Sequence, residues 1–225
     1  EDILYAFPNA LTEKEPDIIF VVGGDGTMFQ AVKELGFLKI PFFGIANGTL
    51  NFLMNSTKNL KWENFSFEIE KTFFLNIKTG NKSYNVVNDV VFGNGIMDYF
   101  HFNVKTDGYE GNISAGGLCI STPLGSTAFH YNNGGNIIPS LNLPLVGVTS
   151  VVGKKDERIN KLFSLEEITV NVDGRTDCFL FLDGKTEIVK VSDSVKISRG
   201  ADIELAFLNL KDFKIKRIGV WICFG

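Results

Sequence analysis

The stretch IIFVVGGDGTMFQAVKEL, residues 18–35, indicates a strand, a glycine turn and a helix in immediate succession. Its first five residues are apolar and mostly β-branched, which favours a buried strand. Apolar residues at helical spacing after the turn GGDGT, Gly23–Thr27, predict a helix over Thr27–Leu35. Such a turn offers backbone N–H groups to a phosphate, and we expect its glycines to adopt positive φ and to let an anion approach closely.

Asp25 stands in the middle of this turn, where a carboxylate repels a bound phosphate. The residue therefore suggests a second task, either binding a metal ion or taking a proton from an attacking hydroxyl. The alternative is structural: Asp-Gly is a common turn pair, and Asp25 would then cap the helix that follows. The turn alone leaves both interpretations open.

The composition indicates a globular protein with a sizeable core. The chain has 225 residues, 44% of them hydrophobic, and a mean hydropathy of +0.10, so it has room for one large domain or two small ones. The 21 Phe residues, against 2 Trp and 5 Tyr, favour buried packing and strand-rich structure. A net charge of −4 argues against nucleic-acid binding through a basic surface.

Cysteines, histidines and apolar runs argue against a metal centre and a membrane segment. Cys119, Cys178 and Cys223 are widely spaced and form no CxxC pair, which favours reduced thiols in a cytoplasmic protein. His101 and His130 lie far apart in the sequence, and we expect neither to bind a metal. No apolar run approaches the ~20 residues that span a bilayer, so we expect no membrane partner.

Three regions of different texture divide the chain. Strand and helix signals alternate up to Trp62, and a second buried strand, Phe42–Ile45, follows the helix, so parallel βα units are the natural arrangement. We therefore expect an N-terminal α/β domain over residues 1–62, to which residues 208–225 return, and a β-rich domain over residues 63–207.

Short β-rich runs with frequent turns mark the second region and favour antiparallel sheets or a sandwich. The expected strands cover residues 67–77, 84–92, 100–105, 168–172, 178–182, 187–191 and 194–197. Asp173-Gly174 and Asp183-Gly184 have the form of hairpin turns.

A second cluster of glycines and small hydroxyl residues lies at residues 120–138, ISTPLGSTAFHYNNGGNII. Hydroxyls and free backbone amides can bind ribose and phosphate oxygens, and small side chains let a nucleotide come near. A helix that starts near Thr127–Phe129 would direct its amino end at the bound group. By composition alone, an ordinary Ser/Gly-rich loop is the alternative.

A third candidate is the polar pair Asn88-Asp89 within the valine run VVNDVV, residues 86–91. A polar pair is costly to bury without partners, so its presence suggests a site. The alternative is that strand alternation places one member on a solvated face.

Taken in order, the three motifs resemble those of the NAD kinase family: GGDGT at Gly23–Thr27, Asn88-Asp89, and STPLGSTA at Ser121–Ala128 followed by Gly134-Gly135. That family carries a GGDGT loop, an Asn–acidic pair and a TPTGSTAY-like segment followed by GG. Diacylglycerol and other lipid kinases share the first loop, whereas the Thr-Pro-x-Gly-Ser-Thr-Ala segment is much more specific. The resemblance is close over residues 18–140 and looser over the β-rich remainder.

The resemblance implies an enzyme that phosphorylates the adenosine ribose 2′-hydroxyl of NAD, with ATP or polyphosphate as donor, to give NADP. It places Asp25 near that hydroxyl, as general base or as a group that aligns the donor, and it implies a Mg²⁺ ion that bridges the donor phosphates. The nucleotide-binding residues that it implies are Gly23, Gly24, Gly26, Thr27, Phe52, Asn88, Asp89, Thr122, Gly125, Ser126, Thr127, Ala128 and Phe129.

The same resemblance implies an architecture and partners. A small Rossmann-like α/β domain would carry the GGDGT loop, an all-β sandwich-like domain would supply the other two motifs, and the active site would lie in the cleft between them. NAD and ATP are the expected partners, and a homodimer or homotetramer is the expected assembly.

Several residues depart from the family pattern. Phe129 stands where Tyr is usual, which keeps a stacking surface and removes a hydroxyl. Ser114–Gly117 stands where an Arg-Gly-Asp-Gly stretch often precedes the Thr-Pro segment, so an Arg and an Asp are missing. In the loop Gly44–Leu53, Ala46 replaces a polar residue and Asn51 replaces a glycine.

Two other functions compete with this interpretation. A lipid kinase of the diacylglycerol type shares the first loop and the two-part plan, but it gives no reason for Ser121–Ala128. A non-catalytic nucleotide-binding regulatory module would explain the missing Arg and Asp, but it gains little from Asp25 beside phosphates.

Overall fold

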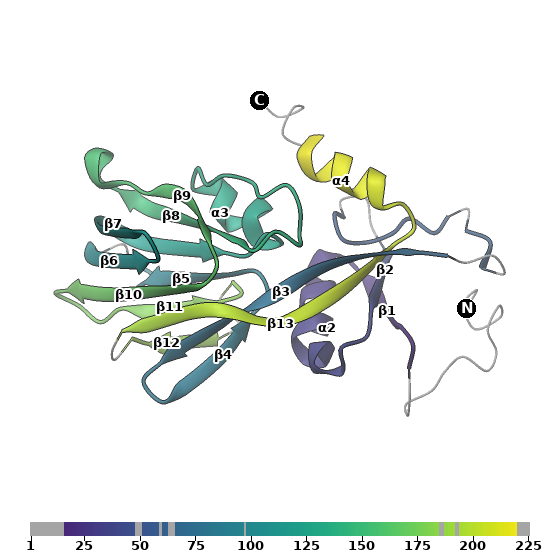
Figure 1. The fold of residues 1–225 in the computed structure, drawn as a ribbon, viewed down its shortest axis with the longest axis horizontal. Helices are drawn as coiled ribbons and strands as arrows, with labels where there is room; N and C mark the ends of the chain where they lie inside the picture. Colours follow the sequence, from purple (N-terminus) through teal and green to yellow (C-terminus); the bar gives the residue numbers. More distant parts are fainter. Residues whose placement is uncertain are drawn as a thin grey trace. The chain divides into compact units, whose positions relative to one another are not determined.

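The structure is a computed structural model, and it describes residues 16–47, 51–58, 60–62, 66–96, 98–184, 187–191 and 194–219. The chain divides into two compact units: unit 1 comprises Glu1–Lys71 and Asp202–Gly225, and unit 2 comprises Thr72–Ala201. The divisions fall within two long strands, β3 (Glu68–Thr79) and β13 (Val195–Phe207). The described residues form mainly strands, which belong to a mixed sheet, and few helices (Figure 1).

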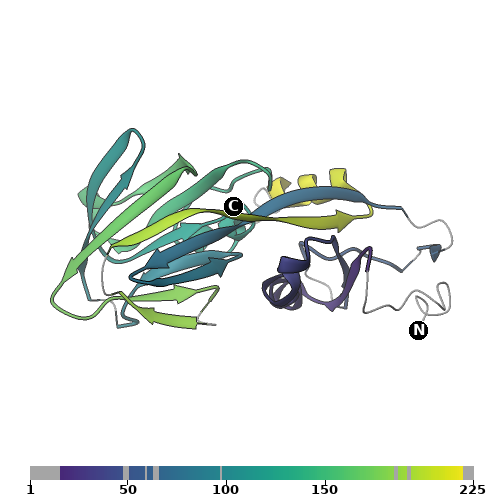
Figure 2. The ribbon, with the colours of Figure 1, turned by 60° about the horizontal axis from the view of Figure 1, so that its bottom comes forward.

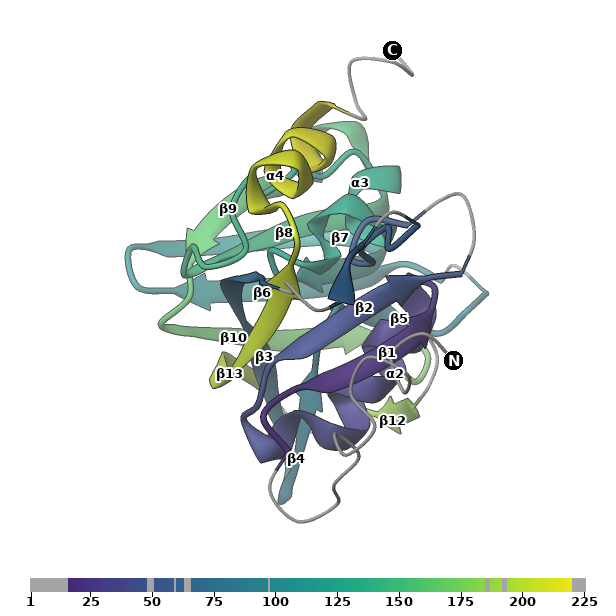
Figure 3. The same cartoon turned by 90° about the vertical axis from the view of Figure 1, so that its right-hand side faces the viewer.

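Unit 1 contains the strand, turn and helix that the GGDGT stretch predicts. Its elements are β1 (Ile19–Gly23), α2 (Asp25–Leu35), the 3₁₀ turn η1 (Gly36–Leu38), β2 (Phe42–Ala46) and, near the end of the chain, α4 (Leu210–Gly219). β1 and β2 pair in parallel, as expected for βα units, and lie side by side in Figure 3. β2 also pairs in parallel with the end of β13.

Gly44 lets helix α2 pack closely against β2. A Cβ at this position would lie 2.8 Å from Cε of Met28, on α2, and 2.6 Å from Sδ of Met54. Both methionines are buried, and they fill the space that the missing side chain leaves. The helix that follows the glycine turn is therefore held against the sheet by packing at Gly44.

Asn55 ties three segments of unit 1 together. Its buried side-chain amide donates to the carbonyl oxygens of Gly44 and Ala206, each at 3.0 Å, and its Oδ1 accepts the N–H of Leu208 at 2.8 Å. A buried side chain with this many partners fixes β2 and the end of β13 relative to the loop after residue 51. That loop is the one that contacts Asp25, as described below.

Unit 2 consists almost entirely of antiparallel strands, drawn from blue-teal to green in Figure 2. Besides parts of β3 and β13, its strands are β4 (Lys82–Val86), β5 (Asp89–Gly93), β6 (Phe100–Thr106), β7 (Tyr109–Ser121), β8 (Leu145–Gly153), β9 (Asn160–Ser164), β10 (Glu167–Gly174), β11 (Phe179–Leu182) and β12 (Glu187–Lys190). Its helical turns are η3 (Gly125–Thr127), α3 (Phe129–Asn132) and η4 (Lys155–Glu157).

Strand β7 is the centre of unit 2, because it pairs with β6 along its first half and with β5 and β8 along its second half. Side chains alternate along these strands. Phe100, Phe102 and Val104 of β6 belong to the apolar core of the unit, which takes side chains from most of its strands. Phe73 and Phe92 lie in the same core.

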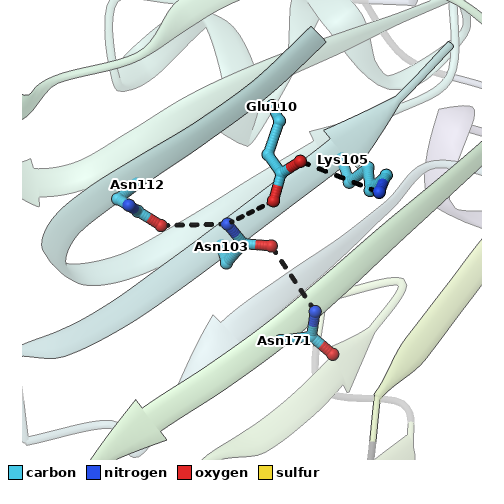
Figure 4. A network of polar contacts seen from close by, with 5 residues as sticks. All are labelled: Asn103, Lys105, Glu110, Asn112 and Asn171. Atoms are coloured by element: carbon cyan, nitrogen blue, oxygen red, sulfur yellow. Dashed lines mark hydrogen bonds and ion pairs between the residues drawn. The ribbon is translucent and has the colours of Figure 1, made fainter.

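The residues between these core positions carry polar groups across neighbouring strands (Figure 4). The side-chain amide of Asn103, on β6, donates to Oδ1 of Asn112 at 2.9 Å and to Oε1 of Glu110 at 3.3 Å. Oδ1 of Asn103 in turn accepts a hydrogen bond from the amide of Asn171, on β10, at 3.5 Å. Lys105 pairs with Glu110 at 3.7 Å. These side chains are solvent-exposed, so each contact contributes little to stability.

The structure corrects four expectations. Helix α2 begins at Asp25 and not at Thr27, so Gly26 is helical, and Gly24 is extended at φ −116°; neither adopts the expected positive φ. The expected strand over residues 84–92 is broken at 87–88 into β4 and β5. Asp173-Gly174 lies within β10, opposite His101 and Phe100, and is no hairpin turn. Strands β7, β8 and β9 and helix α4 were not predicted.

Asp183-Gly184, in contrast, is the turn after β11 that its sequence predicts. Both residues adopt positive φ, at +46° and +69°, as the tight turn between antiparallel strands requires. Among the residues that the structure describes, no helix is long and apolar enough to cross a bilayer. Cys119 and Cys178 are free thiols, and Cys223 lies outside the described residues.

Candidate functional site

In unit 1, Asp25 is the first residue of helix α2 and directly follows the strand and the two glycines. Its carboxylate does not cap the helix, because the N-cap is Gly24 and the cap has no side-chain hydrogen bond. The carboxylate instead accepts the N–H of Phe52 at 3.1 Å (Oδ1) and 2.9 Å (Oδ2), and that of Leu53 at 2.9 Å (Oδ1). The helix-cap interpretation of Asp25 is therefore wrong.

The glycine turn is closely packed against Thr27 of helix α2 and against Asn51. A Cβ on Gly23 would lie 2.5 Å from Oγ1 of Thr27, and a Cβ on Gly24 would lie 3.3 Å from Oδ1 of Asn51. The position of Gly26 is open, with no atom within 4 Å of an added Cβ. The first N–H groups of an α-helix have no acceptor within the helix, so this end of α2 offers donors to an anion.

In unit 2, a pocket of about 410 Å³ gathers several of the predicted residues. Asn88 and Asp89, from the break between β4 and β5, line it together with Ala128 and Phe129 from the start of α3. The remaining lining residues, none of them predicted from the sequence, are mostly apolar or glycine: Val91, Phe92, Gly93, Gly95, Gly116, Gly117, Val151, Phe181 and Gly184. An apolar pocket with a few polar groups is the usual form of a small-molecule site.

Two polar atoms at this pocket have no hydrogen-bond partner in the described part of the chain: Oδ1 of Asn88 and Oδ2 of Asp89. Both atoms are buried, and leaving such groups unpaired costs free energy. A bound ligand with hydroxyl or amino groups would satisfy them. The pair Asn88-Asp89 is therefore not explained by strand alternation, because Asp89 is 2% exposed and Asn88 is half-buried.

Burial raises the pKa of Asp89 to about 7, and the negative charge of Asp183 adds to the rise. The carboxyl group therefore changes its charge near neutral pH. When protonated, it can donate a hydrogen bond to a ligand as well as accept one.

The segment Ser121–Ser126 holds the Asn88 backbone in place. The hydroxyl of Thr122 donates to the carbonyl oxygen of Val87 at 2.8 Å, and the N–H of Thr122 donates to that of Asn88 at 3.0 Å. The hydroxyl of Ser126 donates to Pro123 and accepts the N–H of Ile138. Thr122 and Ser126 are both fully buried with their hydroxyls engaged, and their contact with a nucleotide stays a prediction.

Gly125 leaves room for the Asn88 side chain. A Cβ on Gly125 would lie 2.2 Å from the backbone carbonyl oxygen of Asn88 and 2.5 Å from its Oδ1. After Gly125, Thr127 and Ala128 are half-buried, and Phe129, at the pocket, is 41% exposed. The STPLGSTA segment thus packs against the Asn-Asp pair, as the order of the motifs suggested, although 32 residues separate Asp89 from Thr122.

The two histidines have different surroundings. His101 is exposed, with Nδ1 2.8 Å from Oγ of Ser114, and His130 is fully buried. Among the described residues, no three His, Cys, Asp or Glu side chains lie close enough together to hold a metal ion.

Asp183 is the residue at this site whose role sequence reasoning missed. Its carboxylate accepts the backbone N–H groups of Val87 and Asn88, at the break where the predicted strand stops. The only signal in the sequence was the Asp-Gly pair, which also marks an ordinary turn.

Comparison with known proteins identifies both halves of the chain. The model of the ATP-NAD kinase N-terminal domain matches residues 3–72, and that of the ATP-NAD kinase C-terminal domain matches residues 77–208. The NAD kinase of Fusobacterium nucleatum subsp. nucleatum is 30% identical over 206 residues, which cover 81% of this chain and 76% of that protein. The NAD kinase of Lachnospira eligens is 34% identical over 150 residues, 60% of this chain and 51% of that protein.

Solved structures show the same fold at lower identity. An NAD kinase from Archaeoglobus fulgidus, in complex with ATP, has a TM-score of 0.77 at 20% identity and covers 100% of this chain and 94% of its own. Yeast NADH kinase, complexed with NADH, has a TM-score of 0.75 at 18% identity and covers 94% of this chain and 68% of its own.

Proposed function

The chain belongs to the NAD kinase family, and from this premise we propose that it transfers the γ-phosphoryl group of ATP to the 2′-hydroxyl of the adenosine ribose of NAD, giving NADP and ADP. The observation that carries the proposal is the pocket in unit 2, where Oδ1 of Asn88 and Oδ2 of Asp89 are buried without partners. Ribose hydroxyls are groups that both atoms can bind.

The lining of the pocket also suits the adenosine of NAD. Ala128 and Phe129 line it beside Asn88, and four glycines (Gly93, Gly95, Gly116, Gly117) leave its wall without side chains. A flat ring can approach a glycine-lined wall closely and stack on Phe129. We assign ribose contacts to Asn88 and Asp89, and adenine contacts to Ala128 and Phe129, with Thr127 beside them.

Asp25 would take the proton of the attacking hydroxyl. The 2′-oxygen forms a bond to the γ-phosphorus, the bond from phosphorus to the bridging oxygen of ADP breaks, and the 2′-OH proton passes to the carboxylate. Within the described part of the chain, Oδ1 of Asp25 accepts two N–H groups and Oδ2 accepts only that of Phe52, so Oδ2 retains a lone pair for the hydroxyl.

The donor phosphates would bind at the start of helix α2. Phosphoryl transfer depends mainly on positioning and charge neutralisation, and the N–H groups of a helix start supply both. Gly26, which has open space around its Cα, leaves room for phosphate oxygens. We also propose the finer division that the motifs imply: a Rossmann-like unit 1 with the GGDGT loop and a sandwich-like unit 2 with the other two motifs.

A Mg²⁺ ion would arrive with the ATP phosphates, whose charge it neutralises. The described residues hold no cluster of three His, Cys, Asp or Glu side chains for it. Asp25 is the carboxylate at the glycine turn, and Mg²⁺ commonly binds through one or two carboxylates plus substrate phosphates. The residues present therefore fit a Mg²⁺ ion that is coordinated mainly by the phosphates of its nucleotide.

The family match favours this activity over the two alternatives from the sequence. A lipid kinase would leave the STPLGSTA segment and the Asn-Asp pair without a role, whereas the NAD kinase C-terminal domain model includes both. A regulatory module would not need Asp25. A homodimer or homotetramer is the assembly that we propose on the same family grounds, and sedimentation equilibrium would measure it.

The proposal is tested by NADP formation from NAD, ATP and Mg²⁺. We expect product from the wild-type chain and at least a ~100-fold loss in Asp25→Asn, with NAD binding retained. Asp17→Asn is the matched control, since Asp17 is exposed and precedes β1 in the same unit. No product from the wild-type chain, with ATP or with polyphosphate, would overturn the proposed function.

A further inference from the structure

The break between β4 and β5 leaves two backbone N–H groups without strand partners, at Val87 and Asn88. Val87 is 1% exposed, so water does not reach it freely. The carboxylate of Asp183 accepts both groups: Oδ1 lies 2.7 Å from the Asn88 nitrogen and 3.1 Å from that of Val87, and Oδ2 lies 3.2 Å from the latter. Charge-assisted bonds of this kind are stronger than neutral ones.

The contact is made in both directions. The backbone N–H of Asp183 donates to the carbonyl oxygen of Asp89 at 3.0 Å, so the turn after β11 and the break before β5 hold each other. On the opposite side, Thr122 occupies the carbonyl oxygens of Val87 and Asn88. The backbone of residues 87–89 is therefore fixed from two sides, by Asp183 and by Thr122.

The fixed backbone sets where the pocket's polar groups point. The Asn88 side chain lies against Gly125, and its Oδ1 and the Oδ2 of Asp89 remain unpaired at the pocket. Gly184, the neighbour of Asp183, lines the same pocket. Asp183 is not among the residues that line the pocket, but it fixes the backbone of Asn88 and Asp89, which are.

We propose that Asp183 is a positioning residue for NAD, whose carboxylate holds the turn at Val87–Asn88 so that the side chains of Asn88 and Asp89 meet the dinucleotide. This inference rests on the proposed function. Asp183 acts through the backbone of other residues, and it takes no part in the transfer of the phosphoryl group. Its loss should therefore weaken NAD binding while the chemical step is retained.

The test compares Asp183→Ala and Asp183→Asn with the wild-type chain in KM for NAD, in kcat and in the Kd for NAD measured by calorimetry without ATP. In Asp183→Ala we expect KM and Kd to rise at least ~10-fold, because both charge-assisted bonds are lost, and kcat to change less than ~3-fold. In Asp183→Asn, Oδ1 still accepts the N–H of Asn88, but an NH₂ group faces Val87, so an intermediate rise is expected.

Asp107→Ala is the matched control, because Asp107-Gly108 is the Asp-Gly turn between β6 and β7, away from the pocket. A combined variant separates positioning from general destabilisation. If Asp183 acts through Asn88 and Asp89, then Asp183→Ala adds less than ~3-fold to the KM of the Asn88→Ala, Asp89→Ala variant. A full, independent ~10-fold increase in that background would overturn the inference.

Two further outcomes would also overturn it: a folded Asp183→Ala with wild-type KM and Kd, or, if that variant does not fold, an Asp183→Asn with wild-type values. Failure of the proposed function is recognised separately. In that case the wild-type chain itself forms no NADP and binds no NAD in the calorimeter.

Discussion

Phe52 holds the carboxylate of Asp25 through its backbone: the single N–H of Phe52 lies 3.1 Å from one carboxylate oxygen and 2.9 Å from the other. Leu53 adds a third contact at 2.9 Å. The group proposed to accept the substrate proton is thus also the group that anchors the loop after residue 51. Its catalytic and structural tasks cannot be removed separately by deleting the side chain.

Asp25→Asn should therefore loosen this loop as well as stop the reaction. The amide has one acceptor oxygen, and its NH₂ group would face a backbone donor, so we expect unit 1 to lose about 1–3 kcal/mol of stability. Hydrogen exchange of the Phe52 and Leu53 amides measures this directly, and both should exchange faster in the variant. Unchanged protection of the two amides, with Asp17→Asn as reference, would show that Asp25 does not anchor the loop.

Gly125→Ala should weaken NAD binding by displacing Asn88. The added Cβ would stand 2.2 Å from the backbone carbonyl oxygen of Asn88 and 2.5 Å from its Oδ1, so both the backbone and the carboxamide of Asn88 must shift at the pocket. We expect the Kd for NAD to rise at least ~10-fold, the usual cost of a lost polar contact and a displaced side chain. Gly219→Ala is the control, since nothing lies within 4 Å of a Cβ there. A Kd within twofold of wild type in Gly125→Ala would contradict the arrangement.

The sequence was sufficient for the local features with strong signals. The apolar run before GGDGT predicted β1 and the parallel β1–β2 pair, and Asp183-Gly184 predicted its turn. The three motifs predicted the family, which the domain models confirm. In these cases the information lies in neighbouring residues, whose spacing alone favours one conformation.

Other features depend on contacts between distant residues and could not be read locally. The valine-rich run over residues 84–92 resembles one strand, and where it breaks its backbone N–H groups are satisfied by the Asp183 carboxylate, 95 residues beyond Asn88. Strand β7 holds three small residues, Ala115, Gly116 and Gly117, which weaken its strand signal. Its pairing with β5, β6 and β8 outweighs that local preference.

NAD binding should weaken as the pH rises through neutrality. Burial raises the pKa of Asp89 to about 7, so the carboxyl is neutral below that pH and charged above it. A charged carboxylate repels the phosphates of NAD, and we expect the Kd to rise by up to about tenfold per pH unit above 7. Asp89→Asn, which is neutral at all pH values, should abolish this dependence.

His101→Gln serves as the control, because it changes an exposed residue that does not line the pocket, and it should retain the pH dependence. Calorimetry at pH 6, 7 and 8 measures the effect. A Kd that does not vary with pH in the wild-type chain, or that varies equally in Asp89→Asn, would exclude Asp89 as the titrating group.

The stability of unit 2 should depend on pH through two buried groups with opposite effects. Burial lowers the pKa of His130 to about 4 from its usual 6.5. The contribution of the neutral ring to the free energy of unfolding is therefore complete above pH 6.5 and is lost as the pH falls towards 4. Asp89 behaves in the opposite way, because its pKa of about 7 lies above the usual 3.8: its contribution is complete below 3.8 and is lost as the pH rises to 7.

Between pH 4 and 6.5 these two dependences cancel in the wild-type chain, since folding takes up one proton at Asp89 and releases one at His130. In Asp89→Asn only the pH dependence of His130 should remain, so the free energy of unfolding should fall by about 1.4 kcal/mol for each pH unit below 6.5. His130→Leu should give the reverse slope. Urea unfolding followed by far-UV circular dichroism at several pH values measures both, and parallel profiles in the two variants would contradict the assignment.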